Sequence, residues 1–154
     1  MLSQQEISDR LEIQDLVYHY ADLIDRRCFD ELRGVFTEDA HIDYSAFGGA
    51  VGSREETIAF LHAALGAQLF PHTQHLNANV QVRVTGDTAS GRVMCFNPME
   101  VALPEGGSQT FFLGLWYLDD YRRTADGWRI SRREEIKSWT FNTPDFMQLQ
   151  ENVT

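Results

Sequence analysis

Apolar and polar residues alternate along residues 76–84 of the chain. The even positions hold leucine, alanine and three valines, whereas the odd positions hold two asparagines, a glutamine and an arginine. This two-residue period predicts a strand with one packed face and one face that is wet or lines a cavity. His75 stands directly before the segment, on the polar side of the alternation. Its imidazole therefore faces either solvent or a pocket.

The N-terminal part of the chain has the helical period instead. Ser3 and Glu6 have the spacing of a capping box, and apolar residues follow at helical intervals as far as Ile24. These signals predict a first helix over roughly residues 4–26. Three more elements are predicted before residue 70: a short helix carrying Phe29, Leu32, Val35 and Phe36, a strand over 40–46, and a third helix that follows a second capping box at Ser53 and Glu56.

After Pro71 the pattern predicts about four long strands, separated by turn residues at Gly86-Asp87, 104–107 and Asp126-Gly127. The segment 110–118, TFFLGLWYL, is apolar on both faces. It should therefore be a central strand, with helices on one face and a partner subunit on the other. Helices followed by an antiparallel sheet predict a single α+β domain over residues 1–154 and a homodimer or higher homo-oligomer.

Composition narrows the classes of partner. The chain carries 23 acidic and 13 basic residues, a formal charge of -10, which disfavours binding to nucleic acid or to an anionic membrane surface. Cys28 and Cys95 fit no metal or redox spacing and predict two core thiols in a reduced, intracellular chain. The N-terminal residues lack the pattern of a signal peptide, and no segment has membrane-spanning length. We expect a cytoplasmic protein without membrane contact.

Among the parts that common reactions need, only acid–base groups remain, because the sequence has no phosphate loop, nucleophile elbow or metal-ligand spacing. His72 and His75 are three residues apart at a strand start, so they should point to opposite faces. Asp25 lies near the end of the first helix, where the helix dipole disfavours an acid, so another interaction should hold it. A surface salt bridge to Arg26 or Arg27 would satisfy it, and His75 would then be a solvated structural residue.

Tyrosines provide the candidate hydrogen-bond donors of a pocket. Tyr18, Tyr20 and Tyr44 could each serve there, or each could be a core aromatic residue with a satisfied hydroxyl. The residues alone leave these alternatives open.

The order of the parts resembles the nuclear transport factor 2-like superfamily, specifically its SnoaL-like branch, over roughly residues 5–140. The resemblance rests on residues 12–44 (EIQDLVYHYADLIDRRCFDELRGVFTEDAHIDY), on the turn and helix start at 48–56, on 73–91 (TQHLNANVQVRVTGDTASG) and on 121–133 (YRRTADGWRISRR). It implies a cone-shaped, curved antiparallel sheet wrapped around the N-terminal helices. A pocket would lie inside, and a dimer would usually form across the sheet.

Enzymes of the scytalone dehydratase and hexachlorocyclohexane dehydrochlorinase families are similar to this chain at the positions of their catalytic residues. The resemblance implies a catalytic Asp25–His75 pair, and the dehydratases add Tyr44. The other catalytic positions of the dehydratases fall on Ile24, Met99 and Tyr117, so scytalone is not the expected substrate.

The resemblance and the residues together predict a cofactor-independent small-molecule lyase or isomerase without a metal. His75 would be the general base, Asp25 would orient it, and Tyr44 would donate to a developing oxyanion. Two alternatives are a non-catalytic small subunit, similar to those of aromatic-ring hydroxylating dioxygenases, and a binding protein for a hydrophobic metabolite. An apolar or aromatic substrate is expected to contact Tyr18, Met94, Phe96, Phe112 and Trp116.

The last predicted feature is the C-terminal segment 139–146, WTFNTPDF, which should close over the pocket mouth or the dimer edge.

Overall fold

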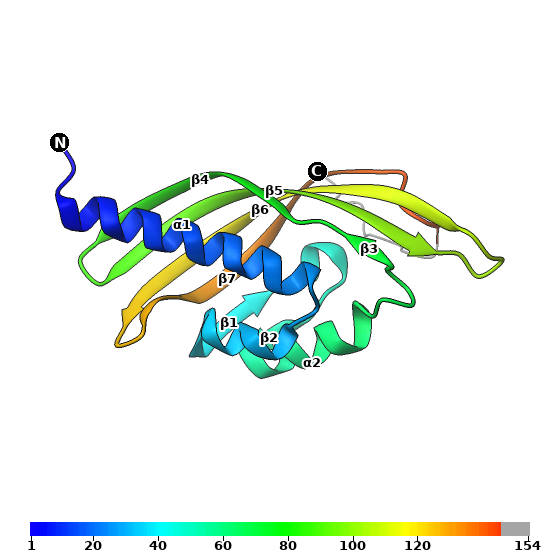
Figure 1. Cartoon of the computed structure of the whole chain (residues 1–154), viewed down its shortest axis with the longest axis horizontal. Helices are drawn as coiled ribbons and strands as arrows, with labels where there is room; N and C mark the ends of the chain where they lie inside the picture. Colours follow the sequence, from blue (N-terminus) through cyan, green and yellow to red (C-terminus); the bar gives the residue numbers. More distant parts are fainter. Residues whose placement is uncertain (146–154) are drawn as a thin grey trace.

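The computed structural model describes residues 1–145, which fold into one curved sheet with helices on its concave side (Figure 1). The elements in chain order are α1 (Gln4–Asp25), η1 (Phe29–Gly34), β1 (Phe36–Asp43), η2 (Ser45–Phe47), β2 (Val51–Ser53), α2 (Arg54–Ala64), β3 (His72–Thr73), β4 (Leu76–Thr85), β5 (Thr88–Ala102), β6 (Ser108–Thr124) and β7 (Gly127–Phe141). The α+β class, the first helix and the four long strands are confirmed. No helix within residues 1–145 is long and apolar enough to cross a membrane.

The sheet has the strand order β2-β1-β7-β6-β5, and both β3 and β4 pair with β5. It is mixed and not wholly antiparallel, because β1 runs parallel to β7 while the other pairs are antiparallel. A parallel pair needs a long connection, and here α2 and five strands separate the two partners. In Figure 1, α1 runs along the inner face of the long strands, and α2 lies beside β1 and β2 at one end.

The region after α1 differs from its prediction. The short helix is a 3-10 turn that ends at Gly34, and β1 begins at Phe36 instead of residue 40. Val35 and Phe36 are buried and meet β7, where the Ile130 N–H donates to the Val35 carbonyl at 2.9 Å. An aromatic residue and a β-branched one at this position favour a strand over a further helical turn.

The core lies between α1 and the inner face of the sheet. Along β6 the odd-numbered residues from Phe111 to Tyr117 are buried under the helix, whereas Phe112 and Trp116 alternate onto the outer face. Cys95 is buried in this core and Cys28 is half-buried, and both thiols are free. The strand therefore has one face in the core and one apolar face directed away from the helices.

A bulge in β4 breaks the alternation that the sequence shows. The pairing with β5 shifts between Ala78 and Gln81, and Asn79 adopts a positive φ of 47°. Asn77, before the bulge, donates to the Val17 carbonyl of α1 at 3.1 Å, so it points inward. Beyond the bulge the valines pack on the core instead. The bulge thus allows polar residues at the start of β4 and apolar residues at its end to share the inner face.

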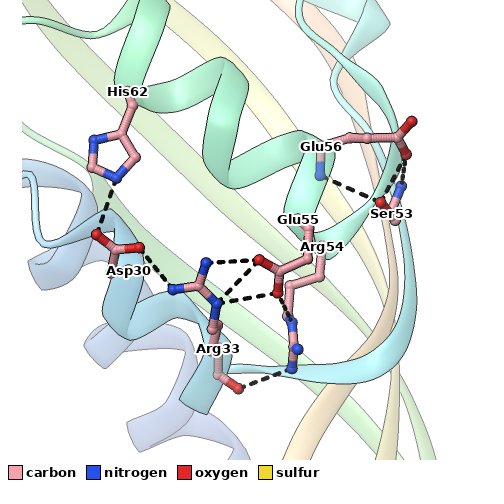
Figure 2. Close-up of polar contacts among 7 residues, drawn as sticks. All are labelled: Asp30, Arg33, Ser53, Arg54, Glu55, Glu56 and His62. Carbon is pink, nitrogen blue, oxygen red and sulfur yellow. Dashed lines mark hydrogen bonds and ion pairs between the residues drawn. The ribbon is translucent and has the colours of Figure 1, made fainter.

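Helix α2 is fixed to η1 by a surface network of charges (Figure 2). Ser53 and Glu56 form a complete capping box at its first turn. Arg33 of η1 bonds the Glu55 carboxylate at 2.7 Å and the Asp30 carboxylate at 2.7 Å. Exposed pairs of this kind stabilise a fold only modestly. Their geometry nevertheless fixes the position of α2, whose apolar face forms one wall of the cavity described below.

Candidate functional site

A cavity of about 180 Å³ lies between the helices and the inner face of the sheet. Its lining is mainly apolar and includes residues from α1, α2, β5, β6 and the loop before β3: Ile24, Phe60, Leu61, Phe70, Met99, Leu113 and Leu115. Six side chains bring polar atoms to the same wall, namely Tyr20, Tyr44, His75, Asn97, Tyr117 and Glu135. A small apolar cavity with a few polar groups is the usual form of a ligand site.

His75 lines this cavity, and Asp25 bonds its imidazole from outside the lining. The His75 Nδ1 and the Asp25 Oδ1 are 2.7 Å apart, and the His75 backbone N–H donates to Oδ2 at 2.9 Å. The Thr73 hydroxyl donates to Oδ1 at 3.1 Å. The imidazole is only 10% exposed. The carboxylate therefore accepts three hydrogen bonds, two of them from His75.

The end of α1 places Asp25 beside His75. The Cys28 N–H bonds the Leu23 carbonyl, the Arg27 N–H bonds the Ile24 carbonyl, and Arg27 has a positive φ of 59°, which together form a Schellman motif. The Arg27 guanidinium donates to the carbonyls of Leu65 and Phe70, and so ties the end of α1 to the segment that leads into β3.

Neither neighbouring arginine pairs with the Asp25 carboxylate. Arg26 bonds Asp22 at 3.0 Å, and Arg27 is used on backbone carbonyls. Burial raises the pKa of the Asp25 carboxyl, but the hydrogen bonds and charge of His75 and the Thr73 hydroxyl outweigh it and lower that pKa from its ordinary value. An ionised carboxylate only accepts, so Nδ1 carries the hydrogen in this pair, and a neutral imidazole then has its lone pair on Nε2. No residue within 1–145 forms a hydrogen bond to Nε2.

Tyr44 lies in the cavity wall together with Tyr20, and their hydroxyl oxygens are 2.7 Å apart. Burial raises the pKa of Tyr20 to about 12 and raises the pKa of Tyr44 well above its usual value. Arg133 lies beneath this pair, with its guanidinium carbon 4.1 Å from the centre of the Tyr20 ring. Both phenols are therefore neutral hydrogen-bond donors at physiological pH.

Two polar lining residues were missed from the sequence. Asn97 donates to the Gln74 carbonyl at 2.8 Å and so fixes the loop before His75. Glu135 reaches the cavity because the pairing of β7 with β6 shifts at Ser131, so that Ile130 before the bulge and Glu135 after it both face inward. Strict alternation would have placed Glu135 on the opposite face from Ile130, and no residue pattern in the sequence indicates the bulge.

The five predicted substrate contacts lie elsewhere. Tyr18 is 42% exposed on α1, and its hydroxyl accepts a hydrogen bond from Gln14. The other four occupy even positions of β5 and β6 and therefore face away from the helices: Met94, Phe96, Phe112 and Trp116. Their apolar character suits either face, and the register of the two strands decides which one they occupy. The cavity instead contains the alternate positions, including Asn97, Met99, Leu113 and Tyr117.

Within residues 1–145, no three histidine, cysteine, aspartate or glutamate side chains gather in a way that could hold a metal ion. The polar groups of the cavity are a histidine, a carboxyl group, an amide and phenols, which are the groups that acid–base chemistry uses.

Comparisons with known proteins agree with this fold. A family model of the SnoaL-like domain matches residues 5–134. The protein Rv2910c of Mycobacterium tuberculosis is 54% identical over 137 residues, which cover 89% of this chain and 90% of that protein.

Two solved structures share the fold. A candidate scytalone dehydratase from Novosphingobium aromaticivorans has a TM-score of 0.81 at 21% identity, covering 93% of each chain. A hexachlorocyclohexane dehydrochlorinase from Novosphingobium barchaimii has a TM-score of 0.73 at 18% identity, covering 90% of this chain and 92% of that one. Because the family model spans most of the chain and the mycobacterial relative is similar over nearly its whole length, the chain belongs to the SnoaL-like domain family.

Proposed function

We propose that the protein is a cofactor-independent lyase or isomerase that removes a proton from carbon in a small apolar or aromatic substrate. The Asp25–His75 pair, whose imidazole lines an apolar cavity, is the observation that carries this proposal. The names of the two structural neighbours add support, since a dehydratase and a dehydrochlorinase both catalyse eliminations.

The proposed step begins at His75 Nε2, which takes the proton from the carbon acid. In an elimination, the electrons of the broken C–H bond form the new double bond, and the leaving group departs from the next carbon with its bonding pair. In an isomerisation, the proton returns to another carbon of the same molecule. Asp25 stabilises the imidazolium that forms and holds the ring in one tautomer. Tyr44, paired with Tyr20, would donate to negative charge that develops on the substrate.

The volume of the cavity limits the substrate. A cavity of roughly 150 Å³ with an apolar lining accommodates benzene, and the cavity here measures about 180 Å³. We therefore propose a substrate built on a single ring or of similar size, bound mainly by apolar contact with Ile24, Phe60 and Leu113.

The general base can be tested without knowing the natural substrate. The probe 5-nitrobenzisoxazole loses its C3 proton to a base, its N–O bond breaks, and a coloured cyanophenolate forms. His75→Ala should lower the rate at least about 100-fold, because general-base catalysis contributes factors of that order. His72→Ala is the matched control, since His72 is 82% exposed, and it should retain the full rate. Equal rates for the native protein and His75→Ala would favour the binding-protein or non-catalytic-subunit alternative.

The pair should also act as a unit. Asp25→Asn should lower the probe rate at least about tenfold, because an amide group does not enforce the required tautomer or stabilise the imidazolium. The double variant should be little slower than His75→Ala alone, since residues of one catalytic unit have non-additive effects. Circular dichroism would verify that each variant folds. Fully additive losses in the logarithm of the rate would contradict coupling between the two residues.

A further inference from the structure

Glu135 is a carboxyl group of the cavity that the proposed base chemistry does not use. It lies on β7 opposite Tyr117 of β6, and both side chains line the cavity. No hydrogen bond or ion pair to its carboxyl forms among residues 1–145. Glu135 is half-buried, so its carboxyl group can meet a ligand that enters the cavity and can take from that ligand the partner that the described residues do not supply.

Arg133, the cation two residues before Glu135, is already committed to another carboxylate. Arg133 donates to the Asp119 carboxylate through Nε at 2.8 Å and Nη2 at 2.7 Å, and both side chains are fully buried. The Tyr121 hydroxyl adds a third hydrogen bond to Asp119 at 2.9 Å. Arg133 therefore neutralises Asp119 and leaves Glu135 without a bonded counter-charge.

The surroundings of Glu135 favour its neutral form. Burial, opposed by the charge of Arg133 and assisted by that of Asp43, raises the pKa of Glu135 to about 8. Four further titratable groups near it, Tyr20, Tyr44, Cys95 and Tyr117, are uncharged at neutral pH because burial raises the pKa of each. His75 also faces this cavity, from the side of β4. At pH 7 the group is thus mainly a carboxylic acid, which can donate one O–H to a ligand.

We propose that Glu135 is a hydrogen-bond donor of this pocket beside the tyrosines, and that the substrate carries an uncharged oxygen, as a carbonyl or a hydroxyl, which the Glu135 carboxylic acid binds. Strands β5 and β6 separate β7 from β4, so Glu135 and His75 approach the cavity from different sides. The substrate class is accordingly an oxygenated aromatic or alicyclic compound, and not a hydrocarbon or an alkyl halide. This inference rests on the proposed function.

If the substrate carries a hydroxyl group, His75 and Glu135 together supply the base and the acid that a dehydration needs. His75 takes the proton from carbon, and the C–H electrons form the double bond. The C–O bond breaks with its electron pair on oxygen, and the Glu135 proton completes a water molecule. Glu135 is then a carboxylate and His75 an imidazolium, and transfer of one proton from His75 to Glu135 through solvent restores both groups.

Binding of two probes of nearly the same shape tests the proposal without turnover. Acetophenone carries a carbonyl oxygen where α-methylstyrene carries a methylene group. Dissociation constants from ligand-observed NMR titration at pH 6.5 should favour acetophenone about tenfold in the native protein, the value of one net hydrogen bond. Glu135→Leu should abolish this preference, whereas Glu135→Gln should keep it because its amide N–H donates. Glu134→Gln is the matched control, since Glu134 instead pairs with Arg132, and it should keep the native preference.

Two further measurements complete the test. Raising the pH from 6.5 to 9.5 should weaken the preference in the native protein, as Glu135 ionises, and leave it unchanged in Glu135→Gln. The pH series also tests the proposal if Glu135→Leu does not fold. His75→Ala should retain the preference although it lacks the base, so failure of this inference and failure of the proposed function are distinguishable. Equal affinity for the two probes in the native protein, no measurable binding of acetophenone, or a preference that survives in folded Glu135→Leu would overturn the proposal.

Discussion

Three carboxyl groups of this chain differ in the direction in which their pKa is shifted, because their hydrogen-bond partners differ. Asp9 and Asp25 are held by donors, and the pKa of each is lowered. Glu135 has no such donors, and burial raises its pKa to about 8. Burial alone would raise all three values. The number of donors aimed at each carboxyl therefore decides whether it serves as an anion or as an acid.

Asp9 gives a prediction about stability and pH. It is 2% exposed and accepts hydrogen bonds from Arg123, Gln5 and Trp128, and that from Arg123 contributes most to a pKa of about 2. A lowered carboxyl pKa gives stability that is present above the unfolded-state value, near 4, and is lost as the pH falls towards the folded-state value. Asp9→Asn should therefore lower the free energy of unfolding by about 2 kcal/mol at pH 6, and the difference should shrink towards pH 2.

Urea denaturation of both proteins between pH 6 and pH 2 measures this difference. Asp87→Asn is the control, since Asp87 bonds the same Arg123 but is 82% exposed. It should change the free energy of unfolding by less than about 1 kcal/mol at pH 6. Curves for the native protein and Asp9→Asn that run parallel over this pH range would contradict the assignment.

At the scale of the element, local signals predicted the helices, strands and turns but not the faces of two strands. The start of α1 at Gln4, the capping box of α2 and the turns between strands follow from neighbouring residues. The bulges at Asn79 and Ser131 do not, because a bulge depends on the pairing with the next strand. Each bulge moves later residues to the opposite face.

The candidate site likewise contains residues that could be predicted from the sequence and one that could not. Asp25 and His75 are 50 positions apart in the sequence and meet in the fold. Only the resemblance to known enzymes predicted this contact. Glu135 could not be predicted in the same way, because the resemblance implies no equivalent for it. The alternation of β7 also gave the wrong face for it relative to Ile130.

The bulge in β4 gives a prediction of its own. Asn79 has a φ of 47°, in the left-handed region that asparagine and glycine tolerate and that β-branched residues avoid. Asn79→Val should lower the free energy of unfolding by roughly 1–2 kcal/mol, whereas Asn79→Gly should be close to neutral. Chemical denaturation compares the two variants. A valine variant as stable as the glycine variant would mean that the left-handed conformation does not persist at this position.

At the scale of the whole molecule, the two faces of the sheet differ in what covers them. The inner face packs on α1 and α2 and contains the cavity. The outer face carries Phe96 and Phe112, whose ring centres are 5.5 Å apart, with Trp139 and Phe141 packed beside them. Trp139 and Phe141 thus lie on the outer face, where they could contribute to a dimer edge, while Phe146 of the same predicted segment lies outside the described residues.

The outer face of the sheet is the surface that could form the interface of the predicted homodimer. Exposed apolar side chains such as Ile136, Trp139 and Phe141 form one surface with the half-buried aromatic residues of β5 and β6. A continuous apolar surface on a sheet is typical of a face that binds a partner. The homodimer expected from the sequence therefore remains our prediction, with this face as its interface.

Ile136→Asp tests the interface directly. Ile136 is 37% exposed and pairs with Trp116 across the outer face, so the substitution should leave the monomer fold intact but place a charge at the centre of the dimer contact. An aspartate buried without a partner should weaken dimerisation by at least tenfold. Sedimentation velocity at micromolar concentration should show a dimer for the native chain and a monomer for the variant. Leu11→Asp, at a leucine of α1 that is 56% exposed, is the control and should remain dimeric. A native chain that sediments as a monomer would exclude this interface, and a dimer that survives Ile136→Asp but not Leu11→Asp would move the interface to the helical face.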